Sequence, residues 1–281
     1  MIHVNEFDYI VRIPNIELEK MTRLEKTRND RSADREYVMG LEKGLAIIEA
    51  FGIVKGPLTL TRAAEVTGHS KASIRRSLIT LCELGYARQQ GREFSLAARA
   101  LRLGHAYVAS DALAKVAQPI LEMTSERTAE SASIAVLDSQ DAVFVARSTH
   151  RRSLSSGLGV GARLPAYCSA TGRVLLSEMA PAEVGFLLNR MSRPAFTPHT
   201  RTSTKDIVRE IKLARSQGYA INDEELEIGL RSIAVPIRNG AGELMAAISL
   251  SVATSRLNRD EVVEKLLPEL ETARRIFASL L

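Results

Sequence analysis

The sequence lacks the long apolar segment that a membrane-spanning helix requires. Its 281 residues are 45% hydrophobic and 25% charged, but no uninterrupted apolar run approaches the roughly 20 residues that cross a bilayer. The first residues include Glu6 and Asp8 and contain no basic start followed by an apolar run, so we expect no secretory signal peptide. These absences predict a cytoplasmic protein that does not insert into membranes.

Cysteine and the short motifs of common enzymes are also scarce. The two cysteines, Cys82 and Cys168, have no CxxC spacing, which disfavours a disulfide framework or a structural zinc site. Walker A, HExxH and GxSxG motifs are missing, and the five histidines are scattered. We therefore expect no enzyme, no metal centre and no cofactor. An active site assembled only by the tertiary fold is the alternative.

The positive charge is concentrated in one segment. Residues 38–105 contain ten Lys or Arg against five Asp or Glu, whereas residues 1–37 have seven against eight and residues 106–281 have 21 against 20. The net charge of +5 is thus the charge of the middle segment. A localised basic excess is typical of a nucleic-acid-binding module, and a merely solvated surface is the alternative.

Within this basic segment the pattern predicts a winged helix-turn-helix. Apolar residues at helical spacing indicate a first helix with one buried stripe, made of Leu41, Leu45, Ile48 and Phe51. A short helix over 60–67 and a third helix starting after Ser70 are separated by the turn 68–69, which is helix-turn-helix spacing. Two alternating runs around Gly91 then predict a β-hairpin, the wing.

The third helix predicts an interface with double-stranded promoter DNA. Small and basic side chains lie opposite its apolar residues, so early residues can reach base edges in the major groove and arginines can reach guanines or phosphates. Arginines of the hairpin are placed to meet the flanking backbone. The predicted DNA-binding residues are Thr61, Ser70, Lys71, Ala72, Ser73, Arg75, Arg76, Thr80, Arg88 and Arg92.

The rest of the chain predicts an α+β domain on an antiparallel sheet, because strands, hairpins and helices are mixed. The length favours two domains. We expect a loosely ordered tail over 1–37, the winged helix-turn-helix over 38–96, a linker helix over 97–117 and an effector-binding domain over 118–281. Pro119 predicts a bend or break in the helix that contains it. Other expected elements are a hairpin at 133–147, strands at 219–222, 232–237 and 244–252, and helices at 204–217 and from Asn258 onward.

Three stretches make the chain resemble the IclR family of bacterial transcriptional regulators. They are GLEKGLAIIEAFG at 40–52, LPAYCSATGRVLLSEM at 164–179 and GYAINDEELEIGLRSIAVPI at 218–237. The third is the most specific, and the likeness covers about residues 38–281. The runs DEELEIGLRSIAVPI and LPAYCSATGRVLL are most similar to the branch that controls catabolism of protocatechuate and 4-hydroxybenzoate.

The C-terminal signature of the family is matched with two departures. The chain complies with the signature at Gly218, Glu225, Ser232, Ile233 and Ala234. Asn222 stands where Asp or Ser is usual, and Arg238 where an aromatic residue or His is usual.

The resemblance implies a winged helix-turn-helix joined by a helix to a GAF-like effector-binding domain. It also implies homodimers, often tetramers, and a small carboxylic acid as effector, with a hydroxylated aromatic acid such as 4-hydroxybenzoate or protocatechuate favoured. The implied effector-binding residues are Ala170, Thr171, Asn222, Ser232, Ser249 and Ser251. On position alone, Leu154, Leu158 and Tyr167 are candidates for an apolar wall. RNA polymerase is a further candidate partner, which the tail over 1–37 would bind.

Physical chemistry supports part of this assignment. The first turn of a helix opening at Ser169 offers free N–H groups and a dipole that suit a carboxylate. Ser249 and Ser251 are two apart on a strand, so their hydroxyls share one face. The alternative to effector binding is that the hydroxyls of Ser249 and Ser251 bond each other or the backbone. For the protein, the alternatives are a regulator of a small aliphatic acid such as glyoxylate or pyruvate, and a structural DNA binder without an effector.

Overall fold

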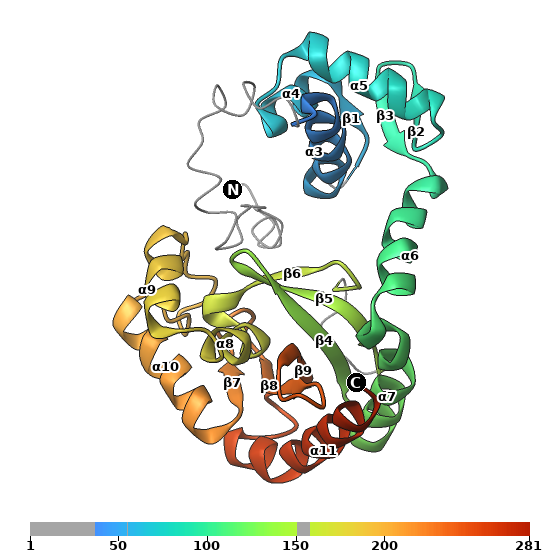
Figure 1. Ribbon diagram of the computed structural model, residues 1–281. Helices are drawn as coiled ribbons and strands as arrows, with labels where there is room; N and C mark the ends of the chain where they lie inside the picture. Colours follow the sequence, from blue (N-terminus) through green and yellow to red (C-terminus); the bar gives the residue numbers. More distant parts are fainter. Residues whose placement is uncertain (1–36, 55, 151–157) are drawn as a thin grey trace. The chain divides into compact units, whose positions relative to one another are not determined.

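The structure is a computed structural model and describes residues 37–54, 56–150 and 158–281 (Figure 1). The chain divides between Ser110 and Asp111 into two compact units. Within the described ranges, no helix is both long enough and apolar enough to cross a membrane.

The first unit is a small helical domain with a three-stranded sheet. Its helices are α3 (Met39–Val54), α4 (Leu60–Thr67) and α5 (Lys71–Glu83). Its strands are β1 (Leu58–Thr59), β2 (Ala87–Gln90) and β3 (Glu93–Leu96), in the antiparallel order β1-β3-β2. The predicted winged helix-turn-helix is confirmed.

The buried face of α3 differs from the predicted stripe. Leu41 and Leu45 are 63% and 47% exposed, whereas Ile47, Ala50 and Phe51 are buried. The core cluster of this unit begins at Ile47, in the second half of α3. The predicted stripe is wrong in its first half, since spacing alone does not tell which turns of a helix have a partner.

The segment 97–117, expected to link the domains, is divided between two helices in the structure. After a 3₁₀ turn, α6 (Leu101–Ser110) ends before Asp111, and α7 (Ala112–Thr128) begins after it. Asp111 has an extended backbone, and its carboxylate accepts an amide hydrogen bond from the first turn of α7 at 2.9 Å, which starts a new helix. The helix α7 continues through Pro119, so no break occurs there.

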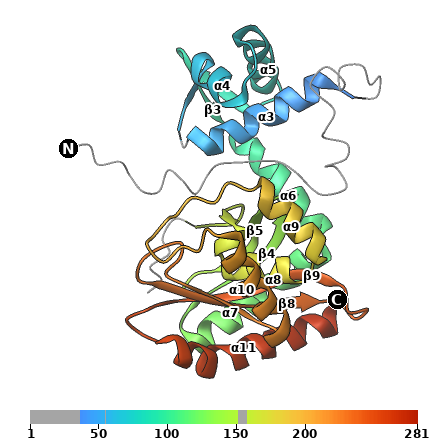
Figure 2. The ribbon, with the colours of Figure 1, turned by 90° about the vertical axis from the view of Figure 1, so that its left-hand side faces the viewer.

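The second unit is built on a six-stranded antiparallel sheet (Figure 2). Its strands, in the order β6-β5-β4-β9-β8-β7, are β6 (Arg163–Pro165), β5 (Asp141–Ser148), β4 (Ser131–Asp138), β9 (Leu244–Ala253), β8 (Leu230–Arg238) and β7 (Ala220–Asp223). One face is covered by α7 and α11 (Arg259–Leu280). On the other lie the 3₁₀ turn η3 (Ala166–Cys168) and helices α8 (Ala170–Ser177), α9 (Pro181–Arg190) and α10 (Thr204–Gln217). The predicted α+β class is confirmed.

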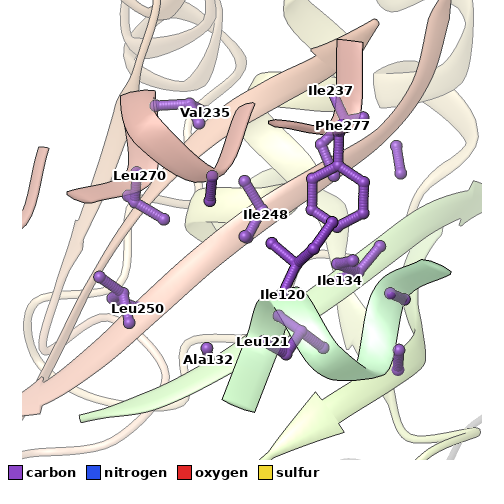
Figure 3. Packing of buried hydrophobic residues seen from close by; sticks show 14 of the residues in the cluster. Ile120, Leu121, Ala132, Ile134, Val235, Ile237, Ile248, Leu250, Leu270 and Phe277 are labelled. Atoms are coloured by element: carbon purple, nitrogen blue, oxygen red, sulfur yellow. The ribbon is translucent and has the colours of Figure 1, made fainter. Parts of the chain in front are cut away.

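The main core of this unit lies between the sheet and the helices α7 and α11 (Figure 3). Alternate strand residues such as Ile233 and Ile248 point into it and meet Leu121, Leu270 and Phe277, which are fully buried. Successive side chains of a strand point to opposite faces. The residues between the core positions therefore face α8, and they decide what that side of the sheet can bind.

Candidate DNA-binding and effector-binding sites

The helices α4 and α5 each begin at a residue whose side chain caps the first turn. Thr59 Oγ1 accepts the Arg62 amide at 3.2 Å at the start of α4, and Gly68, with a φ of 67°, ends that helix in the left-handed region. Ser70 Oγ accepts the Ser73 amide at 3.3 Å and begins α5. These caps and Gly68 fix where the two helices of the helix-turn-helix begin and end.

The helix α5 buries Ile74, Leu78 and Leu81 and presents its other face to solvent. The predicted DNA-binding residues that are exposed are Thr61, Ser70, Lys71, Ala72, Arg75, Arg76, Thr80, Arg88 and Arg92. Ser73 is the exception, because it is only 8% exposed and belongs to the buried side of α5. Ser73 therefore does not share the exposed face of the other residues, and its assignment to the DNA interface stays a prediction.

The hairpin β2–β3 carries two arginines of this set. Arg88 pairs with Ser95 across the strands, and Gly91 turns the chain with a φ of 60°. The Gln89 side chain donates to the Gly91 carbonyl at 2.8 Å, which fixes the tip, and Arg92 follows directly. The basic groups of the hairpin thus project from an ordered turn.

In the second unit, a row of polar residues crosses four strands on the face toward α8. Ser131 of β4 lies opposite Ser251 of β9, Ser251 opposite Ser232 of β8, and Ser232 opposite Asn222 of β7. Side chains in such register share a face and stand about 5 Å apart. Ser131 Oγ accepts the His150 amide at 3.1 Å, so the hydroxyl of this serine is bonded to the backbone. These four residues are called the polar row below.

A second polar group lies two residues along the same strands. Ser133 is opposite both Ser249 and Arg147, and the Arg147 Nη1 donates to Ser133 Oγ at 3.0 Å. Arg147 also donates to Thr149 Oγ1 at 3.3 Å, and its guanidinium lies 5.4 Å from the ring centroid of Phe144. Burial lowers the pKa of the Arg147 guanidinium, so an anion beside it is stabilising. A cation, hydroxyls and an aromatic ring are thus brought together.

The start of α8 is packed closely against the turn before it. Ser169 Oγ accepts the Gly172 amide at 3.1 Å and caps the helix. A side chain at position 172 would overlap the backbone of Ala166. Asn222 Nδ2 donates to the carbonyl of Cys168, which ties one end of the polar row to this turn. The first turn of α8 and the polar row are therefore neighbours.

The structure places most of the predicted effector-binding residues on this face. Those described on α8 or in the two polar groups are Ala170, Thr171, Asn222, Ser232, Ser249 and Ser251. Leu154 lies outside the described residues, and Leu158 is half-buried in a loop. Tyr167 is fully buried in the cluster under α9 and α10, and its hydroxyl donates to the Pro194 carbonyl. It supports η3 and α8, and its assignment to the apolar wall stays a prediction.

Sequence reasoning missed four residues of this face, namely Ser131, Ser133, Phe144 and Arg147. The signal for two of them is present, since Ser-Ala-Ser at the start of β4 repeats the alternation of Ser249 and Ser251 in β9. Arg147 stands at the end of the apolar run AVFVAR, where a charged side chain is out of pattern.

Neither a metal nor a reactive thiol stands out among the residues that the structure describes. No group of three or more His, Cys, Asp or Glu side chains in those ranges is arranged to hold a metal ion. Cys168 is fully buried, and burial raises the pKa of its thiol, which disfavours thiolate chemistry.

A basic winged helix-turn-helix on one chain with a separate α+β domain defines a DNA-binding transcriptional regulator that also binds a small-molecule effector. Two family models match the chain: the IclR helix-turn-helix domain at residues 40–91, and the bacterial transcriptional regulator IclR C-terminal domain at residues 105–277. The protein belongs to the IclR family of bacterial transcriptional regulators, and the predicted resemblance is confirmed.

Relatives of known role are similar over most of their length. The Pca regulon regulatory protein of Pseudomonas putida is 40% identical over 245 residues, which cover 87% of this chain and 84% of that protein. The p-hydroxybenzoate hydroxylase transcriptional activator of Acinetobacter baylyi is 37% identical over 238 residues, covering 83% and 88%. A crystal structure of an IclR homolog from Microbacterium hydrocarbonoxydans, complexed with 4-hydroxybenzoate, superposes with a TM-score of 0.73 at 25% identity, covering 86% and 98%. These matches are to regulators, and the protein is not an enzyme.

Proposed function

We propose that this regulator binds promoter DNA as a dimer and changes its activity when a hydroxylated aromatic acid such as 4-hydroxybenzoate or protocatechuate binds the second unit. The observation that carries the proposal is the placement of Arg147 and the polar row on one face of the sheet. The relatives named above support the same class of ligand. Because the protein acts on bacterial DNA, we place it in the cytoplasm.

The spacing on the sheet suits an acid with a hydroxyl at the far end of a benzene ring. The group around Arg147 and the polar row are two residues apart along the strands, or about 7 Å. That distance is comparable with the separation of carboxylate and hydroxyl across one ring. Arg147 would hold the carboxylate, Phe144 would contact the ring, and the polar row, which lies beside the first turn of α8, would bond the hydroxyl. An acid as short as glyoxylate reaches one group only.

Replacing Arg147 with methionine is expected to weaken binding of 4-hydroxybenzoate by about 10- to 100-fold, because a charge-assisted hydrogen bond contributes about 1.5–3 kcal/mol. Titration calorimetry of the purified protein measures this, with benzoate as the ligand that lacks the hydroxyl. The wild-type protein should prefer 4-hydroxybenzoate over benzoate, since only the former bonds the polar row.

A matched control is Arg190→Met, because Arg190 also stacks on an aromatic ring, that of Phe186 at 5.2 Å, but lies on α9. It should bind the ligand as the wild type does. Equal affinity of Arg147→Met and wild type would overturn the assignment of Arg147. A wild-type protein that binds glyoxylate or pyruvate and no aromatic acid would favour the aliphatic alternative, and one that binds no acid would favour a DNA binder without an effector.

We further propose that the dimer forms through apolar helix faces of the first unit. None of the described side chains of α6 is buried in the single chain. Its exposed apolar residues are Leu101, Leu103, Tyr107 and Val108, and those of α3 are Leu41 and Leu45. Sedimentation equilibrium should give a dimer or tetramer that Leu41→Gln with Leu101→Gln weakens; a monomeric wild type would contradict the proposal. Contact between residues 1–37 and RNA polymerase stays a prediction, since that tail lies almost wholly outside the described residues.

A further inference from the structure

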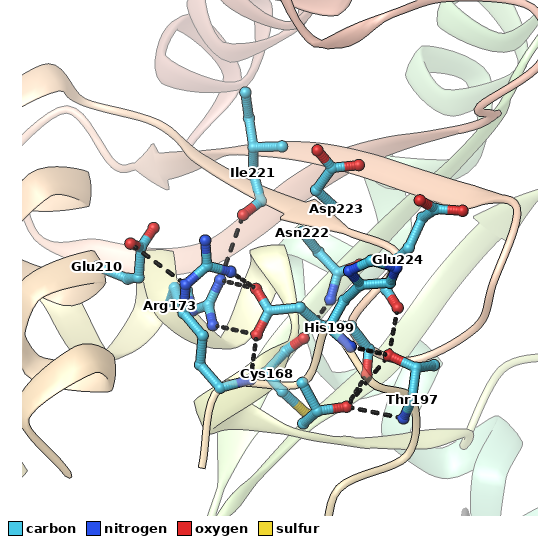
Figure 4. Close-up of polar contacts among 12 residues, drawn as sticks. Cys168, Arg173, Thr197, His199, Glu210, Ile221, Asn222, Asp223 and Glu224 are labelled. Carbon is cyan, nitrogen blue, oxygen red and sulfur yellow. Dashed lines mark hydrogen bonds and ion pairs between the residues drawn. The ribbon is translucent and has the colours of Figure 1, made fainter. Parts of the chain in front are cut away.

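A buried ion network lies beside the effector-facing side of α8 (Figure 4). Arg173 of α8 and Glu225, which follows β7, form two hydrogen bonds, Nη1–Oε1 at 2.6 Å and Nη2–Oε2 at 2.8 Å. Their side chains are 1% and 0% exposed. Arg201 Nη1 bonds the same Oε1 at 2.6 Å. Burying such charges is unfavourable unless their hydrogen bonds are complete. The remaining hydrogen bonds of the network show which segments of the chain it holds in place.

The other donors of Arg173 reach two backbone segments of the proposed effector site. Nε donates to the Tyr167 carbonyl at 3.2 Å, and Nη1 donates to the Ile221 carbonyl at 3.3 Å. Tyr167 precedes Cys168, and Ile221 precedes Asn222. Cys168 and Asn222 are the two residues whose hydrogen bond joins η3 to the polar row. Arg173 therefore holds both partners of that bond from behind.

Glu225 orients Arg173 and also anchors the segment before α10. Its Oε2 accepts the Arg201 amide at 3.0 Å, and its carbonyl accepts Thr200 Oγ1 at 2.5 Å. Next to it, the Glu224 carbonyl accepts Thr197 Oγ1 at 2.7 Å. One carboxylate thus joins α8, the end of β7 and the segment 197–201.

We propose that Glu225 is a positioning residue for effector recognition. Through Arg173 it sets how the first turn of α8 stands against Asn222, and thereby sets effector affinity without touching the effector. This inference rests on the proposed effector site. A purely structural role for Glu225 makes a different prediction, namely that the variant loses stability but retains the affinity and the local packing of η3.

The test compares Glu225→Gln with Leu270→Ala at a temperature where both are folded. Glu225→Gln keeps the shape and removes the charge, whereas Leu270→Ala removes a fully buried side chain on the opposite face of the sheet. Both should lower the unfolding temperature by several degrees. In titration calorimetry with 4-hydroxybenzoate, Glu225→Gln should bind at least about tenfold more weakly than wild type, and Leu270→Ala should bind as wild type does.

A second readout does not need the ligand. In a Cys82→Ser background, the rate at which N-ethylmaleimide labels the fully buried Cys168 reports the packing of η3. Glu225→Gln should raise this rate at least about tenfold over Leu270→Ala, because the bonds to Tyr167 and Asn222 are no longer held. Equal labelling in the two variants would overturn the inference, as would unchanged affinity of Glu225→Gln.

The two proposals fail in distinguishable ways. If wild type binds no acid, the proposed effector fails, and Cys168 labelling still decides whether Glu225 positions η3. If Glu225→Gln does not fold, Glu225→Asp is used, since it keeps the charge but shortens the side chain. Faster labelling of Cys168 in that variant than in Leu270→Ala supports the inference, and an equal rate overturns it.

Discussion

Replacing Gly172 with alanine is expected to destabilise the second unit by about 3 kcal/mol or more and to weaken effector binding. The added methyl group would overlap the Ala166 backbone and come within 2.6 Å of Ser169 Oγ. Backbone cannot move aside as a flexible side chain can, so the cost is that of an overpacked core together with a strained helix cap. Thermal unfolding should show a midpoint lower by about 10 °C for a domain of this size.

The matched control is Gly185→Ala in α9. A methyl group at Gly185 meets nothing within 4 Å, and alanine in a helix is favoured over glycine by about 0.5–1 kcal/mol. This variant should therefore be as stable as wild type or slightly more stable. If Gly172→Ala unfolded at the same temperature as Gly185→Ala, the close approach of η3 and α8 would not exist in solution.

Replacing Arg75 and Arg76 together with alanine is expected to weaken promoter DNA binding by two or more orders of magnitude. Both side chains are exposed on α5, opposite its buried residues, and each base contact by arginine contributes about 1–3 kcal/mol. Fluorescence anisotropy over a range of salt concentrations measures the loss. A shallower salt dependence marks phosphate contacts, whereas changed site preference marks base contacts.

Arg274 and Arg275 provide the control for this double variant, because they are also adjacent arginines on a helix but belong to α11 of the second unit. Their replacement by alanine should leave DNA affinity within about twofold of wild type. Effector binding should be unchanged in the Arg75 and Arg76 variant. Unchanged DNA affinity in that variant would mean that α5 is not the recognition helix.

Helix ends and strand positions were predictable because local chemistry marks them. A helix over 204–217 is expected from the pattern and is observed as α10 (Thr204–Gln217). Asn258 is expected to cap the last helix, and its Oδ1 accepts the Asp260 and Glu261 amides at 3.0 Å each. The strand expected at 244–252 is β9 (Leu244–Ala253). Caps, glycine stops and alternation act within a few residues, so one sequence shows them.

The faces of the elements were less predictable, because they depend on partners that are distant in sequence. Leu41 fits a helical stripe but is exposed, and Ser73 follows the DNA-facing pattern but is buried. Tyr167 was placed by its proximity to α8 in sequence, whereas its ring belongs to the cluster under α9 and α10. Arg147 was missed because its place beside Ser133 follows from strand register, and register is set by long-range pairing.

The middle of the second sheet joins strands from opposite ends of the domain. Ser131 and Ser251 are neighbours across β4 and β9 although 120 residues separate them in sequence. Pairing over such a distance requires closure of a long loop and is slow compared with the local contacts of the first unit. During synthesis the DNA-binding part of the chain emerges first. A chain that stopped before β8 would contain all of α5 and the wing but would lack Ser232 and Ser251 of the polar row. A truncated product of this gene is therefore expected to keep its DNA-binding elements and to lose its response to the effector.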